Sequence, residues 1–250
     1  MNDLRDVTFV IPYYKDSEDR LQNLITVVKY LKKHFTTSIF VQEVGDVRTI
    51  PDDIFEMIDD YTILSFQFPN IIHRTKMINN MVKKVQTPYF CNYDSDIVLK
   101  PEQYLKAHQL LSIGSHVVYP YEIFMRIERK DSQQFFKSLD VSSFKHLQNH
   151  GMSVGGCIFF NRAAFIEGGM ENEYFISYGP EDYEREYRFK TLGYKVDRLY
   201  GTNLYHINHF IGENSDSSHK FFQLNDAEFN KIKNMDRSLL LKYISCWDWK

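Results

Sequence analysis

The stretch YFCNYDSD, residues 89–96, is a short apolar run that ends in two aspartates separated by one serine. The run predicts a buried β-strand, and in open α/β sheets ligands bind beyond the carboxyl ends of the strands. Asp94 and Asp96 would project to the same side there, because residues two apart in a strand face the same way. Two carboxylates suit Mg²⁺ or Mn²⁺ carrying a substrate phosphate, whereas a solvated turn would contain the same acids without a ligand. The stretch alone leaves both interpretations open.

The composition is that of an ordinary globular protein. With 250 residues, 43% hydrophobic and 25% charged, the chain can form one large domain, with or without an appendage. A net charge of −3 gives no basic surface for nucleic acid, and the local cluster of Arg126, Arg129 and Lys130 is expected to be solvated. A nucleic-acid partner is therefore not predicted.

Neither a membrane span nor a disulfide framework is expected. No apolar run approaches the roughly 20 residues that a span requires, and the charged N-terminus is unlike a secretion signal. Three widely spaced cysteines support neither paired disulfides nor a cysteine-based zinc site, and Cys91 and Cys157 are expected to be buried. These features predict a cytoplasmic protein.

Strand-like and helix-like segments alternate along the first half of the chain. Strands are expected at 7–12, 39–44, 61–66, 89–93 and 116–119, and helices at 17–34, 54–58, 75–85 and 102–111. This alternation predicts an α/β fold with a mostly parallel sheet between two layers of helices. The pattern is lost over residues 122–150, which predicts a flexible insertion. Helical apolar spacing after residue 220 predicts a C-terminal helical cap.

Two later blocks carry further candidates. In YGPED, residues 178–182, glycine and proline precede Glu181 and Asp182 at the expected start of a helix over 181–192. Acids there cap a helix in many proteins, but a catalytic base at the edge of a cleft would have the same sequence. In YHINH, residues 205–209, two histidines lie three residues apart. They could complete a metal shell with neutral imidazole nitrogen, although a buried histidine is more often only a core residue.

Several separated segments share their order with a known family. They are VIPY (10–13), HRTKMIN (73–79), DSD (94–96), GG (155–156), GPED (179–182) and HINH (206–209). Together they resemble a nucleotide-sugar glycosyltransferase of the GT-A type. More narrowly, they are similar to the β-1,4-galactosyltransferase group and to the N-acetylgalactosamine-transferring domain of bacterial chondroitin synthases. The resemblance extends over roughly residues 7–210.

The resemblance implies a domain organisation and a donor site. A GT-A domain over 1–212 would comprise a nucleotide-binding half (1–100) and an acceptor and metal half (101–212), followed by a helical extension over 213–250. Residues expected to contact the nucleotide sugar are Pro12, Tyr13, Arg74, Asp94 and Gly156. Of these, Pro12 and Tyr13 would border the uridine, and Arg74 would approach the nucleotide or its phosphates.

The resemblance also implies a metal site. Asp96 and His209 would hold Mn²⁺ (or Mg²⁺). His206 stands at a methionine position of the family, so it is expected either as a third ligand or as a hydrogen-bond donor beside the metal.

On the acceptor side, the resemblance implies that Asp182 is the catalytic base and that Glu181 and Tyr178 bind the acceptor sugar. Tyr178 replaces a tryptophan of the family, and Pro180 replaces a glycine. Because tyrosine has a smaller ring and proline fixes its backbone φ angle, these departures weaken what the resemblance implies about lid motion and acceptor stacking.

The implied activity is a metal-dependent, inverting transfer of galactose or N-acetylgalactosamine from a UDP-sugar to a saccharide hydroxyl. Surface polysaccharide synthesis would be its setting, in the cytoplasm, with room for peripheral association at the inner face of the membrane. Two alternatives remain. One is a retaining or other nucleotide-sugar transferase with the same metal cradle, and the other is a non-catalytic glycan- or nucleotide-binding module.

Overall fold

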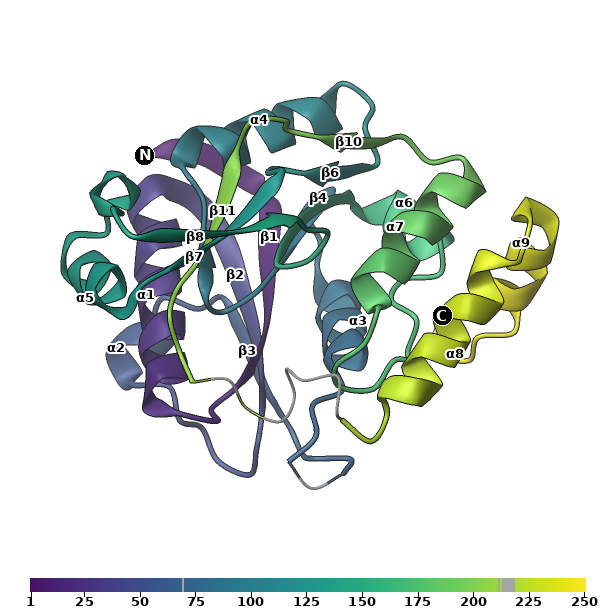
Figure 1. Ribbon diagram of the computed structural model, residues 1–250, viewed down its shortest axis with the longest axis horizontal. Coiled ribbons are helices and arrows are strands. Elements are labelled where there is room, and N and C mark those ends of the chain that lie inside the picture. The colour runs from purple at the N-terminus through teal and green to yellow at the C-terminus, as the bar shows by residue number, and fades with distance from the viewer. Residues whose placement is uncertain (69, 211, 213–218) are drawn as a thin grey trace.

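The computed structural model describes residues 1–68, 70–210, 212 and 219–250 and is built around a seven-stranded sheet (Figure 1). In spatial order the strands are β10 (Val196–Arg198), β6 (Val117–Tyr119), β9 (Cys157–Asn161), β4 (Tyr89–Tyr93), β1 (Asn2–Tyr14), β2 (Phe35–Val44) and β3 (Asp60–Leu64). Neighbours pair in parallel except at β9, which is antiparallel to both β4 and β6. The predicted mostly parallel sheet is confirmed, and the carboxyl ends of β1, β2 and β4 meet at one edge.

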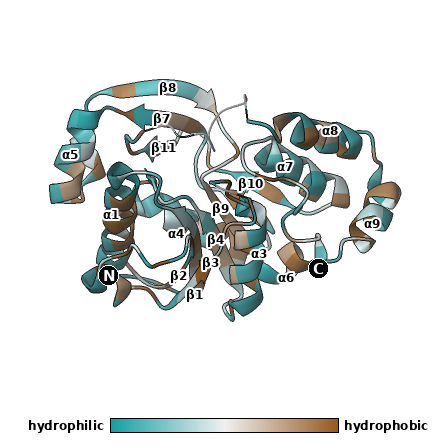
Figure 2. Ribbon diagram, turned by 90° about the horizontal axis from the view of Figure 1, so that it is seen from below, coloured by the Kyte–Doolittle hydropathy of each residue, from teal (hydrophilic) through white to brown (hydrophobic). Residues whose placement is uncertain are grey.

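Helices cover both faces of this sheet, as predicted (Figure 2). One face carries α1 (Glu18–His34) and α4 (Pro101–Ser112), and the other carries α3 (Arg74–Lys84), α6 (Arg162–Glu167) and α7 (Glu181–Leu192). A short helix, α2 (Asp52–Phe55), precedes β3. Among the described residues, no helix combines the length and the apolar character needed to cross a bilayer.

Helix α1 begins and ends where its sequence dictates. The Ser17 side chain accepts a hydrogen bond from the backbone N–H of Arg20, which caps the first turn. Acidic residues follow in that turn and basic residues occupy the last one, which suits the helix dipole. Leu24, Val28 and Leu31 fall on one face and are fully buried against the sheet. This packing fixes the direction in which the first turn presents its polar side chains.

A second sheet replaces the flexible insertion expected over residues 122–150. Its strands, in order, are β5 (Ile97–Val98), β11 (Asn203–His206), β7 (Ile123–Ile127) and β8 (Leu147–Met152), with α5 (Arg129–Ser138) and a 3-10 turn η1 (Val141–Ser143) between β7 and β8. The prediction was wrong because β7 is only partly buried and β8 is mostly exposed, so neither shows alternating hydrophobicity. Buried Asp131 holds the segment by accepting backbone hydrogen bonds from Lys145 and His146, both 2.6 Å long.

Two C-terminal helices, α8 (Phe222–Lys233) and α9 (Arg237–Ser245), pack beside α7 (Figure 1). Their apolar contacts with α7 involve Leu192, Ile232, Leu240, Ile244 and Trp247. Within α7, the fully buried Arg188 pairs with Glu184 at 2.7 Å, and the Trp247 ring covers its guanidinium at 5.2 Å. The predicted helical extension is therefore present and adds a third small core.

Asn225 of α8 ties this extension to the loop that precedes α7. Its Nδ2 donates to the carbonyls of Ile176 and Tyr178, both at 2.9 Å, and its Oδ1 accepts from the N–H of Ile176 at 3.2 Å. A Cβ on Gly179 would lie 2.7 Å from Asn225, so only glycine permits this close approach. The position of the YGPED segment thus depends on α8.

The three cysteines are free. Cys91 and Cys157 are buried on neighbouring strands of the central sheet, as predicted, and Cys246 is exposed.

We predict that Asn225→Ala lowers the free energy of unfolding by about 1–3 kcal/mol, since it leaves part-buried backbone groups of Ile176 and Tyr178 without these partners. The melting temperature should fall by roughly 2–4 °C for each kcal/mol, and hydrogen exchange should accelerate over residues 176–182. Asn230→Ala is the matched control, because Asn230 lies on the exposed side of the same helix. Equal losses of stability in the two variants would contradict the role of Asn225 in holding the loop before α7 against α8.

Candidate active site

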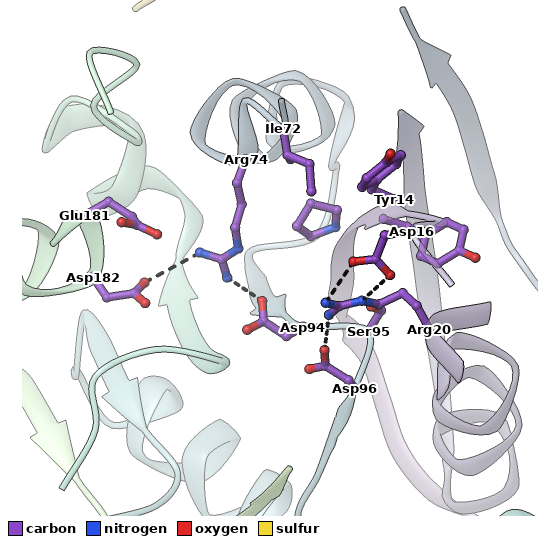
Figure 3. Close-up of a pocket in the computed structure, with 12 residues that line it drawn as sticks. Tyr14, Asp16, Arg20, Ile72, Arg74, Asp94, Ser95, Asp96, Glu181 and Asp182 are labelled. Carbon is purple, nitrogen blue, oxygen red and sulfur yellow. Dashed lines mark hydrogen bonds and ion pairs between the residues drawn. The ribbon is translucent and has the colours of Figure 1, made fainter. Parts of the chain in front are cut away.

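A cavity of about 190 Å³ opens at the carboxyl edge of the central sheet (Figure 3). Its lining residues are Pro12, Tyr13, Tyr14, Asp16, Arg20, Ile72, Arg74, Asp94, Ser95, Asp96, Glu181 and Asp182. They come from the end of β1, the start of α1, the start of α3, the turn after β4 and the start of α7. Seven residues singled out from the sequence thus lie around one cavity. Of those seven, only Glu181 and Asp182 come from the second half of the chain.

One end of the cavity is aromatic. Tyr13 is almost fully buried, and burial raises the pKa of its hydroxyl, so it stays protonated. Tyr14 packs edge-on against Phe66, with ring centroids 5.3 Å apart, and Ile72 lines the cavity close by (Figure 3). The sequence did not single out Tyr14 or Ile72. A flat base fits between such side chains, because aromatic rings offer stacking surface.

Asp96 forms the other end, and His206 and His209 lie beside it without being among the described residues that line the cavity. Its Oδ2 lies 3.1 Å from His209 Nε2, its Oδ1 lies 3.7 Å from His206 Nε2, and the two Nε2 atoms are 3.2 Å apart. The three residues are close enough to hold a single metal ion. The pairing of β11 with β5 brings them together, since the N–H of Ile207 donates to the carbonyl of Asp96 at 2.7 Å.

The charge state of these residues suits a metal ligand set. Burial lowers the pKa of His206 to about 4, so its imidazole is neutral at pH 7. Burial by itself would raise the pKa of Asp96, but His206, Arg20 and His209 outweigh it and hold that pKa below its usual range. One carboxylate and two imidazole nitrogens suit Mn²⁺ better than Mg²⁺, which prefers oxygen ligands alone.

Arg74 lies between two acids at the centre of the cavity. Its Nη2 donates to Asp94 Oδ1 at 2.5 Å, and its Nη1 lies 3.6 Å from Asp182 Oδ1 (Figure 3). Burial works against the charge on Arg74, but Asp94, Asp182 and Glu181 raise its pKa, so the guanidinium stays charged. Arg74 therefore keeps acids from the two halves of the chain together.

Arg185 and the loop before β9 determine where the Asp182 carboxylate lies. The fully buried Arg185 donates to Asp182 Oδ1 and to Glu171 Oε1, each at 2.7 Å. A Cβ on Gly155 would lie 2.2 Å from Asp182 Oδ2, so a side chain at this position of the loop before β9 would displace the Asp182 carboxylate. Gly156, predicted to contact the nucleotide sugar, is not among the described residues that line the cavity. It faces Leu204 and Ile97 instead.

Glu181 and Tyr178 differ in their surroundings. Glu181 is 9% exposed, lines the cavity, and its buried Oε2 has no hydrogen-bond partner among the described residues. Burial raises the pKa of Glu181 to about 8, Asp182 acts in the same direction, and Arg74 opposes them. Tyr178 is outside the cavity lining, is 40% exposed, and stacks on Phe222 of α8 with ring centroids 6.0 Å apart.

We predict that Glu181 makes the protein less stable as pH rises from about 4.5 to about 8. In this window the unfolded chain ionises the carboxyl near its ordinary pKa of 4.5, while the folded protein keeps the proton until about 8. Glu181→Gln should therefore gain thermal stability relative to wild type across the window, and the gain should level off above it. Glu186→Gln on the same helix is the control. A constant difference between Glu181→Gln and wild type from pH 4 to 9 would contradict the prediction.

No known protein family matches the chain, and no curated protein matches it in sequence. Solved structures do match. The catalytic domain of Drosophila β1,4-galactosyltransferase 7 with xylobiose has a TM-score of 0.50 and 16% identity, covering 84% of this chain and 72% of that chain. A mutant of that enzyme with manganese, UDP-Gal and xylobiose matches equally well.

A mannosyltransferase from Pyrobaculum calidifontis, solved with GDP-Man and Mn²⁺, has a TM-score of 0.55 and 12% identity, covering 96% of this chain and 73% of that chain. Likeness at such low identity concerns the fold. The chain therefore has the GT-A fold of these glycosyltransferases.

Proposed function

We propose that the protein is a metal-dependent glycosyltransferase that moves a sugar from a nucleoside diphosphate donor to a saccharide hydroxyl. One observation carries this proposal. A single cavity has an aromatic end and, at its other end, a carboxylate that belongs to a metal-ligand cluster, and it also contains an acid, Asp182, held by two arginines. Two of the similar structures were solved with Mn²⁺ and a nucleotide sugar, which supports the same class of ligands here.

The donor would lie along the cavity. Its base would stack near Tyr14, its diphosphate would cross toward Asp96, and Arg74 would approach its phosphates. Asp96, His206 and His209 would hold the metal, and a metal bound there supplies a Lewis acid for the charge that develops on the diphosphate. The sugar would then face Asp94 and Asp182. The bond to be broken would then lie between the metal cluster and the acid at the start of α7.

Asp182 would take the proton from the acceptor hydroxyl as that oxygen attacks the sugar. The hydrogen bond from Arg185 holds the carboxylate at the cavity edge, where the absence of a side chain on Gly155 leaves room for it. A base in this position contributes about 10²- to 10⁴-fold to the rate. A single displacement would invert the anomeric configuration. Glu181 and Tyr178 would contact the acceptor sugar.

We propose UDP-galactose or UDP-N-acetylgalactosamine as the donor and surface polysaccharide synthesis as the setting. The sequence resemblance to the β-1,4-galactosyltransferase group supports both. A retaining transferase with the same metal cradle would give the other anomer of the product. A binding module without catalysis would bind nucleotide and metal but release no product.

The first test measures nucleotide release from UDP-galactose, UDP-N-acetylgalactosamine, UDP-glucose and GDP-mannose, with Mn²⁺ or Mg²⁺, over a panel of saccharide acceptors. We expect Mn²⁺-dependent turnover of one of the first two donors.

Asp96→Ala should abolish Mn²⁺-dependent UDP binding in calorimetry, because it removes the carboxylate of the ligand set, whereas Asp46→Ala at an exposed site should not. Unchanged Mn²⁺-dependent UDP affinity in Asp96→Ala would refute the metal site. In the turnover assay, a strong preference for UDP-glucose would refute the assignment of UDP-galactose or UDP-N-acetylgalactosamine as the donor.

Asp182→Asn separates catalysis from structure at one position. Asparagine keeps the size and an acceptor oxygen for Arg185 but cannot take the acceptor's proton, so transfer should fall by about 10²- to 10⁴-fold. Affinities for UDP and Mn²⁺ should stay near wild type, and NMR of the wild-type product should show an inverted anomer. A variant that melts several degrees lower yet transfers sugar at a near-normal rate would make Asp182 a structural acid.

A further inference from the structure

The guanidinium of Arg20 pairs with the carboxylate on which the proposed metal site depends. Its Nη1 donates to Asp96 Oδ2, the oxygen that also faces His209 Nε2 at 3.1 Å. On its other side Arg20 reaches Asp16, with Nη2 at 3.4 Å from Oδ2 and Nε at 3.5 Å from Oδ1 (Figure 3). Arg20 thus bridges an acid of the β1–α1 turn and an acid of the metal cluster.

Arg20 and Asp96 pair in a poorly solvated part of the protein, where opposite charges attract each other strongly. The side chain of Asp96 is 5% exposed and that of Arg20 is 16% exposed, so water screens their attraction poorly. A divalent cation coordinated by Oδ2 would be in direct contact with the positive guanidinium. Metal and Arg20 would therefore compete for this oxygen, and a metal bound to Oδ2 would displace the guanidinium.

The diphosphate of the proposed donor would offer the Arg20 guanidinium an alternative partner. Arg20 lines the cavity together with Tyr14 and Asp94, between the aromatic end and the metal cluster. If the proposed donor places its base by Tyr14, its diphosphate must cross this interval. A guanidinium binds phosphate oxygens through paired hydrogen bonds, and Asp16 would keep the other edge of Arg20 in place.

We propose that Arg20 is a counter-ion that passes from Asp96 to the donor's diphosphate, so that metal and nucleoside diphosphate bind cooperatively. This inference rests on the proposed function. Without nucleotide, Arg20 weakens metal binding by holding Asp96. With nucleotide, the diphosphate takes the guanidinium and Asp96 is released to the metal. Because coupling between two ligands is reciprocal, the metal must strengthen nucleotide binding by the same factor.

The test measures the affinity of the full chain for Mn²⁺, by electron paramagnetic resonance of free Mn²⁺, without nucleotide and with saturating UDP or GDP. In wild type, the nucleotide should raise Mn²⁺ affinity by about 5- to 150-fold, the usual range for coupled sites. Arg20→Gln should bind Mn²⁺ alone about tenfold more tightly, and the enhancement by nucleotide should shrink by a similar factor.

Two further variants distinguish direct competition from a general effect of charge. Lys29→Gln removes a positive charge from the same helix, where Lys29 faces Asp53 at 3.8 Å on the surface, and should change neither quantity. Arg20→Lys keeps the charge but loses the two-pronged fork, so Mn²⁺ alone should again bind more tightly than in wild type. It also serves as the readout if Arg20→Gln does not fold.

The outcomes separate this inference from the proposed function. If Mn²⁺ binds with nucleotide but both Arg20 variants match wild type, the competition does not exist and Arg20 only ties α1 to the turn after β4. If wild type binds no Mn²⁺ with either nucleotide, the proposed function fails and this inference fails with it.

Discussion

Repulsion among carboxylates at one edge of the central sheet is the constraint on which the site depends. Asp94, Asp96 and Asp182 share one cavity, and like charges in a poorly solvated space raise the energy of the folded state. Arg20 and Arg74 lie between them and offset that repulsion. The sheet, α1, α3 and α7 are arranged so that Asp94, Asp96 and Asp182 each have a cation in contact with them.

The sequence predicted those parts of the site that depend on local pattern. Asp94 and Asp96 end an apolar strand, and the Ser17 cap with its acidic first turn defines the start of α1. The sequence did not predict Arg20 as part of the site. Arg20 contacts Asp96 across 76 positions of the chain, and hydrophobic periodicity gives no information about such a distant pair. For the glycine pair, the sequence could not tell which member would face Asp182, since that depends on how the loop before β9 turns.

The second sheet is the part of the fold that local sequence pattern did not predict. The partial burial of β7 and the exposure of β8 removed the alternation by which these strands would have been recognised. Their function becomes clear only in three dimensions. Phe124 of β7 packs against the ring of His206 with centroids 5.2 Å apart, and Ser132 of α5 accepts from the N–H of Asn208 at 3.0 Å. The segment that seemed irregular therefore orients the imidazoles beside Asp96.

The cover that Trp247 forms over Arg188 has a consequence for biosynthesis. Arg188 and Glu184 are made long before the tryptophan that shields them, so α7 leaves the ribosome with this ion pair still hydrated on one side. Because Trp247 follows α9 along the chain, Arg188 can lose its water on that side only after α9 has been translated and has docked. A chain released before Trp247 would carry the central sheet and α7 without the ring that shields Arg188.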